Sequence, residues 1–188
     1  MKEPAAITEI NDGELLRRSA RQDEDAFLIL YRRHQGAVFR FALHMSGSRE
    51  TAEEVTQEVF LTLISGGWGY AAEQGSLQGY LIGIARNKVR RQLLRSQKFS
   101  ADCEAKEAQI AAPSYGSDER EVELAALQAA VLSLPPNYRE VVVLCDLEEM
   151  DYSEVAEQLG CPLGTVRSRL YRARAILGSK LCRQMSGS

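Results

Sequence analysis

The chain has few of the residues that build disulfide frameworks, metal centres or catalytic pairs. It contains two histidines and four cysteines, at positions 103, 145, 161 and 182, with no C-x-x-C pair among them. Secreted disulfide-stabilised domains have denser cysteines in shorter chains, and dispersed cysteines indicate zinc only weakly. We therefore interpret the cysteines as mostly buried thiols and expect no metal and no cofactor. Without a nucleophile–base pair or a glycine-rich phosphate-binding loop, the sequence does not indicate an enzyme.

Long hydrophobic runs are also missing. No apolar stretch approaches the roughly 20 residues needed to cross a bilayer, and the N-terminus, MKEPAAITEINDGELL, lacks the apolar segment of a secretory signal. We therefore expect no membrane insertion and a cytoplasmic location. Hydrophobic residues still make up 45% of the 188 residues, which is enough for a folded core. At about 150 residues per domain, this length allows one or two domains.

Acidic residues are absent from two stretches, although the formal net charge is −3. Arg86 to Lys98 contains six cations and no acid, and residues from Pro162 onward contain six more, again with no acid. Glu140 to Glu157 has the reverse composition, with seven acids and no cation. Local charge governs association with a polyanion more than net charge does. The two cationic stretches therefore favour nucleic acid as a partner.

Hydrophobic spacing predicts an all-α protein made of two small helical domains. Residues 97–118 are rich in Ala, Ser, Asp and Glu and predict a flexible linker between the domains. Gly66 to Ser76 is too rich in glycine for a helix and predicts a loop. Helices are expected over residues 12–21, 23–46, 49–64, 77–95, 119–132, 137–147, 151–159 and 162–181.

The segment YSEVAEQLGCPLGTVRSRLYRARAIL, residues 152–177, predicts a helix-turn-helix. The residues expected to pack between its helices are Val155, Ala156 and Leu159 on the first and Val166, Leu170 and Ala173 on the second. This packing leaves polar residues of the second helix facing outward, toward the major groove of duplex DNA. These candidates are Thr165, Arg167, Ser168, Tyr171, Arg172 and Arg174. A helical hairpin with a purely structural role is the alternative.

Two N-terminal segments carry weaker signals. Cations beside Trp68, Tyr70 and Tyr80 are typical of proteins that stack single-stranded bases on aromatic rings, although Tyr80 could equally belong to the core. Residues 52–63 predict a helix with an acidic face, which is usually just solvated but could contact a protein partner. That face contains Glu53, Glu54, Gln57 and Glu58.

Together these segments resemble the bacterial RNA polymerase sigma factors of the extracytoplasmic-function group, in the sigma-70 family, which contain only regions 2 and 4. The resemblance lies in AEEVTQEVF, YLIGIARNKVRRQLLR, LPPNYREVVVL and YSEVAEQLGCPLGTVRSRLYRARAIL. It covers about residues 20–96 and 120–180. It implies that residues 1–96 form region 2, that residues 97–118 are the linker and that residues 119–188 form region 4.

The resemblance implies a transcription initiation factor that binds core RNA polymerase, through the β′ clamp helices and the β flap, and directs it to promoter DNA. It also implies an anti-sigma factor that controls the chain, which would be a monomer or a 1:1 complex with that factor. The residues implied to contact polymerase are Glu54, Gln57, Glu58 and Phe60. Those implied to bind the melted −10 element are Trp68, Tyr70, Tyr80, Asn87, Lys88 and Arg91. The −35 element would be bound as duplex by the candidates of the helix-turn-helix.

One motif departs from the family pattern, which has Phe-x-x-Trp-Leu where this chain has Leu77-Gln78-Gly79-Tyr80-Leu81. Two other classes of function stay open at this point. A conventional regulator with an N-terminal dimerisation domain predicts a stable dimer and palindromic duplex sites. A helical protein-interaction module predicts no DNA binding even at low salt.

Overall fold

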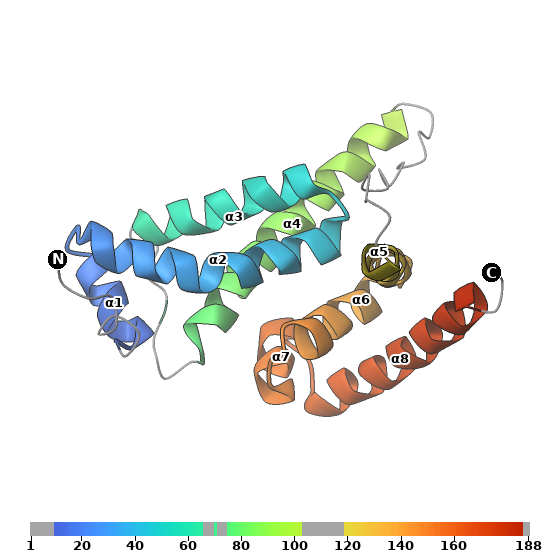
Figure 1. Ribbon diagram of the computed structural model, residues 1–188. Helices are drawn as coiled ribbons and strands as arrows, with labels where there is room; N and C mark the ends of the chain where they lie inside the picture. The colour runs from blue at the N-terminus through green and yellow to red at the C-terminus, as the bar shows by residue number, and fades with distance from the viewer. Residues whose placement is uncertain (1–9, 66–69, 71–74, 103–118, 186–188) are drawn as a thin grey trace.

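The computed structural model describes residues 10–65, 70, 75–102 and 119–185. Every regular element within these ranges is a helix (Figure 1), which confirms the all-α prediction. The elements are α1 (Asp12–Ser19), α2 (Glu24–Ser46), α3 (Arg49–Ile64), α4 (Leu77–Asp102), α5 (Glu119–Leu132), α6 (Pro136–Val142), the π-helix η3 (Val143–Leu147), α7 (Tyr152–Leu159) and α8 (Leu163–Met185).

Several boundaries differ from the expected ones, and three of the differences have a clear structural content. Helix α4 continues to Asp102, so it occupies the first residues of the predicted linker; residues 103–118 lie outside the described part of the chain. The single helix expected over 137–147 is α6 followed by the π-helical turn of η3. Helix α8 begins one residue after Pro162, whose carbonyl accepts hydrogen bonds from Thr165 N at 2.8 Å and Val166 N at 3.3 Å. The proline therefore precedes the first turn instead of starting it.

Capping residues fix the ends of α2 and the start of α3. The Asp23 side chain accepts a hydrogen bond from Ala26 N at 3.0 Å, and that of Ser48 accepts one from Thr51 N at 3.2 Å. Between the two helices, Gly47 has a φ of 73°, a conformation that glycine adopts without strain. A Cβ atom on Gly47 would also lie 3.0 Å from Leu132 of α5. The tight turn thus lets α5 of the C-terminal half approach α2 closely.

The N-terminal half is a bundle in which α2 lies beside α3 and α4 crosses behind them, with α1 packed at one end (Figure 1). Its apolar stripes meet in a core of fully buried side chains, which include Leu15, Leu30, Val38, Phe41, Val55, Val59, Leu81 and Ile82. In the C-terminal half, α6 and α7 both pack against α8. The residues predicted to join the two helix-turn-helix helices are buried or half-buried there, as expected.

The two halves touch through both apolar and polar contacts. Buried residues of both belong to one hydrophobic cluster, and polar contacts join the C-terminal half to α2 and α4. Arg40 of α2 donates to both carboxylate oxygens of Glu148, at 2.9 and 3.3 Å, and the Glu148 side chain has no exposed surface. Arg86 of α4 pairs with Glu140 of α6 at 2.5 Å. Arg139 donates from Nη1 to the Met45 carbonyl at 2.8 Å.

Candidate nucleic-acid and protein-binding surfaces

The turn of the helix-turn-helix is formed by Gly160, which has a φ of 60° and ends α7. Backbone hydrogen bonds close the turn: Gly160 N donates to Glu157 O at 3.1 Å, and Cys161 N donates to Ala156 O at 3.0 Å. With Val155 buried on α7 and Leu170 buried on α8, the opposite face of α8 is left to solvent. This geometry supports the helix-turn-helix predicted from the sequence.

The candidate duplex-binding residues lie mostly on this outer face of α8. Tyr171 is 78% exposed, and the side chains of Arg167, Ser168 and Arg172 are also exposed. Arg174 is exposed too, but its guanidinium donates to Asp146 at 2.5 and 3.0 Å. Thr165 is half-buried and accepts, through its carbonyl, a hydrogen bond from Ser168 Oγ at 3.1 Å. Four of the six candidates thus form one exposed surface, whereas Arg174 is tied to η3 and Thr165 is part of the first turn.

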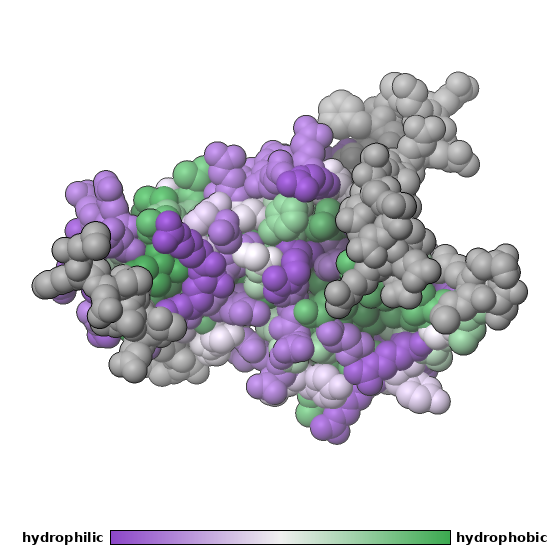
Figure 2. All heavy atoms as spheres, viewed as in Figure 1, coloured by the Kyte–Doolittle hydropathy of each residue, from purple (hydrophilic) through white to green (hydrophobic). Residues whose placement is uncertain are grey.

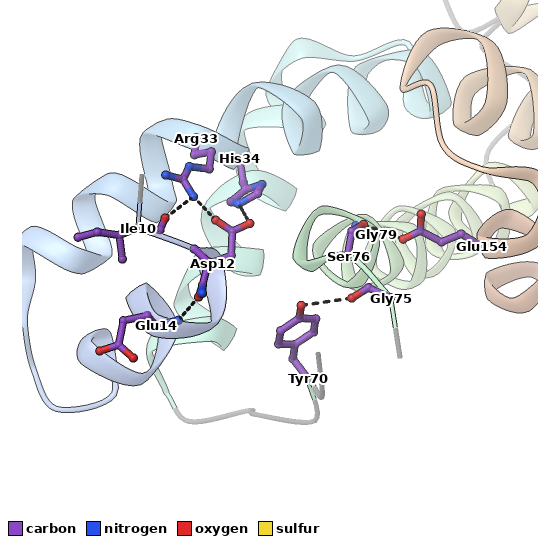
Figure 3. A network of polar contacts seen from close by, with 11 residues as sticks. Ile10, Asp12, Glu14, Arg33, His34, Tyr70, Gly75, Ser76, Gly79 and Glu154 are labelled. Carbon is purple, nitrogen blue, oxygen red and sulfur yellow. Dashed lines mark hydrogen bonds and ion pairs between the residues drawn. The ribbon is translucent and has the colours of Figure 1, made fainter. Parts of the chain in front are cut away.

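The candidate single-strand-binding residues gather at α4. The Tyr70 and Tyr80 rings lie 5.6 Å apart, and the Tyr70 hydroxyl donates to the Gly75 carbonyl at 3.2 Å (Figure 3). Asn87 and Arg91 are exposed farther along α4. Trp68, the remaining aromatic candidate, lies outside the described residues. Two neighbouring aromatic rings, tilted by 53° to one another, followed by polar and cationic side chains fit the platform expected for a single strand.

Lys88 links this surface to α3, because its Nζ lies 2.8 Å from Glu58 of the predicted polymerase-binding set. Gln92 of α4 likewise donates to Glu54 at 2.8 Å. Two of the four predicted polymerase contacts therefore face α4, and they hold α3 and α4 together. Gln57 is exposed, whereas Phe60 is only 3% exposed.

A groove between α2 and α3 adds residues that the sequence analysis did not select. Phe60 forms its floor together with Tyr31, their rings 4.8 Å apart in an edge-to-face arrangement. Leu61 and Ile64, which are 52% and 56% exposed, line its rim with Gln57. Hydrophobic surface gathers at the left of Figure 2, where α2 begins and α3 ends. The signal in the sequence was two large apolar residues outside the buried stripe of the same helix. Such a patch is typical of a protein-binding surface.

No cluster of three or more potential metal-ligating side chains occurs among the described residues. His34 of α2 is 4% exposed, and its Nε2 lies 2.9 Å from Asp12 of α1 (Figure 3). Burial lowers the pKa of His34, and the Asp12 carboxylate partly opposes this effect. The pair fastens α1 to α2. Burial also raises the pKa of the Cys145 thiol to about 11, which makes this cysteine unreactive at neutral pH.

Comparisons with known proteins match both halves. Residues 30–99 match the family model described as Sigma-70 region 2, and residues 124–177 match the model described as Sigma-70, region 4. The chain is 30% identical over 176 residues to the ECF RNA polymerase sigma factor SigM of Mycobacterium tuberculosis, covering 92% of this chain and 86% of that protein. It is 36% identical over 162 residues to the ECF RNA polymerase sigma factor SigE of Mycolicibacterium smegmatis, covering 84% of this chain but only 62% of the relative's length.

Two solved structures share the fold. One is the sigma factor RpoE from Bartonella quintana in complex with the anti-sigma factor NepR, with a TM-score of 0.69 and 24% identity over 82% of this chain and 96% of that chain. The other is CnrH in complex with the cytosolic domain of CnrY, with a TM-score of 0.67 and 22% identity over 92% of this chain and 97% of that chain. Separately, none of the described helices is long and apolar enough to cross a membrane.

Proposed function

The chain belongs to the extracytoplasmic-function group of the sigma-70 family of RNA polymerase sigma factors. From this premise we propose which partner each of its surfaces binds. It binds core RNA polymerase in the cytoplasm and directs it to promoters. The observation that carries the proposal is the presence of two separate cationic surfaces in one chain, of different kinds. One is the outer face of a helix-turn-helix, and the other is an aromatic and cationic face on α4.

The surface on α8 binds the −35 element as duplex. Arg167 and Arg172 have exposed guanidinium groups on the face of α8 opposite its buried stripe, so both can reach base edges or phosphates in the major groove. An arginine that contacts guanine through two hydrogen bonds contributes about 1–3 kcal/mol of discrimination. Arg174 has a lesser part, because Asp146 already holds it.

The surface on α4 binds the −10 element as a separated strand. Tyr70 and Tyr80 offer ring faces on which bases stack, and Asn87 and Arg91 extend from the same helix toward the strand. Two separate domains suit this division, because duplex and melted DNA are bound at different points along one promoter. The residues of this surface, including Trp68 and Lys88, remain assignments that the resemblance implies.

The groove between α2 and α3 binds polymerase. Gln57 was implied by the resemblance, and Leu61 and Ile64 extend the surface with exposed apolar side chains. A helical partner with its own apolar stripe, such as the β′ clamp helices, fits a groove of this kind. Region 4 would contact the β flap. Because RpoE and CnrH were each solved with a partner protein, and RpoE with an anti-sigma factor, we extend the proposal to an anti-sigma factor that binds this chain 1:1.

Gel filtration of the full chain with sigma-free core polymerase tests the proposal. The test pair is Leu61→Ala and Leu94→Ala, because both leucines are 52% exposed but only Leu61 lies in the groove. We expect the wild type and Leu94→Ala to co-elute with polymerase and Leu61→Ala to co-elute more weakly. Adding Gln57→Ala to Leu61→Ala should weaken co-elution further. If a well-folded wild-type chain elutes apart from polymerase as a stable dimer, the dimeric regulator replaces the proposal.

A further inference from the structure

Arg174 differs from the other exposed arginines of α8 because it is paired with an acid. Its Nε donates to Asp146 Oδ2 at 3.0 Å, and its Nη2 donates to Asp146 Oδ1 at 2.5 Å. Two parallel hydrogen bonds of this kind are the strongest arrangement open to an arginine and a carboxylate. The side chains of Arg167 and Arg172 are exposed, and neither pairs with an acid among the described residues. On the outer surface of α8, charge is thus cancelled at Arg174 and left free at Arg167 and Arg172.

The turn that contains Asp146 is anchored in the core. Asp146 lies in η3, directly after Leu144 and Cys145, which are both buried. Met150 N also donates to the Leu144 carbonyl at 3.0 Å, which closes the chain around this turn. Because its neighbours are fixed, the Asp146 carboxylate stays at η3 when the long Arg174 side chain moves. Arg174 must therefore release Asp146 before it can turn to DNA.

Arg174 lies beyond the part of α8 that is expected to read bases. The N-terminal residues of a recognition helix contact base edges, whereas residues toward its C-terminal end contact the phosphate backbone. Arg174 follows Arg167 by about two helical turns, or roughly 10 Å along the axis. It also lies one turn after Tyr171, the most exposed large side chain of the helix. A free guanidinium at this place would contact phosphate, which has the same charge in DNA of any sequence.

The ion pair with Asp146 opposes such a phosphate contact. A cation that neutralises a phosphate releases condensed counterions, which strengthens binding to any duplex and makes it more dependent on salt. A guanidinium that a carboxylate already compensates contributes little of this effect. If Arg174 turned to a phosphate, the Asp146 side chain, which is 26% exposed, would be left beside a polyanion without its partner. The pair therefore lowers the affinity of α8 for duplex DNA without changing how Arg167 and Arg172 meet the bases.

We infer that Asp146 is a positioning residue that limits the sequence-independent affinity of the −35 surface, by holding Arg174 away from the DNA backbone. The inference rests on the proposed role of α8. Sites of other sequence far outnumber promoters in a genome, so each phosphate contact of α8 adds binding at the wrong places as well as at the right one. With this contact withheld, stable binding depends more on the combined use of both DNA-binding surfaces on one promoter.

The test measures duplex binding by the full chain with Asp146→Asn, which removes the charge of this side chain and keeps its size. Glu149→Gln is the matched control, because Glu149 belongs to the same acid-rich stretch, is exposed and pairs with no cation among the described residues. Arg174→Ala and Asp146→Asn/Arg174→Ala complete a double-mutant cycle. Fluorescence anisotropy over a series of salt concentrations measures binding to two probes. One is a short mixed-sequence duplex, and the other is a duplex that the wild-type chain selects from a randomised pool.

We expect Asp146→Asn to bind the mixed-sequence duplex about fivefold more tightly, the factor that corresponds to one well-formed surface ion pair. Its plot of log affinity against log salt concentration should be steeper by about 1, because one more phosphate is neutralised. Its affinity for the selected duplex should rise by the same factor, so that the sequence preference stays unchanged. Glu149→Gln should behave as the wild type does. In the Arg174→Ala background, Asp146→Asn should change little.

Arg174→Lys tests the same point without a change in η3. Lysine keeps the charge but cannot form two parallel hydrogen bonds with a carboxylate. It should therefore be held less firmly by Asp146 and bind the mixed-sequence duplex more tightly than the wild type does, again with a steeper dependence on salt. Circular dichroism of each variant confirms that its helical content is that of the wild type.

Three results would overturn the inference. Unchanged or weaker binding by both Asp146→Asn and Arg174→Lys means that the pair does not withhold Arg174. An equal gain from Asp146→Asn with and without Arg174 means that Asp146 only repels DNA by its charge. A gain confined to one of the two duplexes means that Arg174 contacts bases. These results leave the proposed role of α8 intact, whereas failure of the wild type and all variants to bind any duplex at low salt would contradict that role as well.

Discussion

Helices α4 and α8 carry the same kind of charge but differ in what covers them. Each contains a run of cations without acids. On α8, the side chains of Tyr171 and Arg172 project from the outer face of the helix and are exposed to solvent. On α4, Arg86 is enclosed by Glu140 and Lys88 is paired with Glu58. The comparison teaches that a cationic stretch indicates a polyanion-binding surface, whereas the packing around it decides whether that surface is available.

The difference arises from the position of each helix. Helix α8 lies at the edge of the molecule, with one buried stripe facing α6 and α7 and the rest facing solvent (Figure 1). Helix α4 belongs to the N-terminal bundle, with Leu81 and Val89 in its core, but Arg86 on another face is turned toward α6 of the C-terminal half. Helix α4 therefore packs an apolar face against its own half and directs a cation at the other half. Glu140 of the C-terminal half forms an ion pair with that cation, Arg86, which would otherwise be a largely buried charge without a partner.

The largest expected effect comes from removing the support of α8. Leu170 is 3% exposed between α7 and α8, and Leu170→Ala should lower the free energy of unfolding by about 2–5 kcal/mol, through lost burial and the cavity left behind. Urea denaturation followed by circular dichroism measures this loss. Leu163→Ala, at a leucine 37% exposed on the same helix, is the control and should cost far less. Equal losses would contradict the assigned packing of the two helices.

The next effect sharpens the comparison within α8. Arg172→Ala should weaken binding to a −35 duplex by about 1–3 kcal/mol and relax its sequence preference. Arg174→Ala should have a smaller effect, because Arg174 is already held by Asp146 at 3.0 Å. Fluorescence anisotropy with the duplex and its single-base variants measures both. A loss for Arg174→Ala that matches or exceeds the loss for Arg172→Ala would reverse the roles given to the two arginines.

A smaller effect is expected on α4. Tyr80→Ala should weaken single-strand binding by about 1–2 kcal/mol, because one ring face is lost. Tyr80→Phe keeps the ring and should keep most of the affinity. Titration of a labelled strand measures the difference. If Tyr80→Ala binds the strand as well as its parent does, Tyr80 belongs to the core alone, the alternative left open by the sequence.

The smallest expected effect is that of pH on stability. Both histidines of the chain lie in α2 of the N-terminal half, so the effect should be confined to that half. Burial lowers the pKa of His34 and of His44 below the ordinary value of 6.5. As the pH falls through about 6.5, the histidines of the unfolded chain take up protons that those of the folded chain do not. Protonation therefore favours the unfolded chain, and the free energy of unfolding decreases as the pH falls below about 6.5. Hydrogen exchange at about pH 7.5 and about pH 5.5, corrected for intrinsic exchange rates, should show lower protection of α2 at the acid pH and little change in α8. Equal changes in both helices would contradict this origin.

Most of the fold was predictable, because the helical spacing of apolar residues and the Gly, Pro and Ser residues that end helices are local features of the sequence. The turn at Gly160 and the buried stripe of α8 followed from spacing alone. The end of α4 was missed because residues 97–102 have a mixed composition that does not mark where a helix stops. The break of the helix over 137–147 into α6 and η3 was missed because a π-helical turn leaves no composition signal.

The surfaces were predictable in kind but not in extent. Arg167 and Arg172 were selected from charge and phase, and both are exposed. Leu61 and Ile64 lie outside the buried stripe of α3 but were not selected, because the groove that they line exists only once α2 is placed beside α3. Glu58 was selected as part of an acidic face that a partner could contact, yet its carboxylate pairs with Lys88 from a helix that begins many residues later.

The helices, the helix-turn-helix and the two cationic stretches could be predicted, because each depends on residues a few positions apart. Which cations are free to meet DNA depends instead on contacts between residues far apart in the chain. Arg86 and Glu140 are 54 positions apart, and Ser76 and Glu154 are 78 apart. Contacts over such separations depend on how two domains dock. The docking also brings Glu154 so close to Gly79 of α4 that a Cβ atom there would lie 1.9 Å from its Oε1.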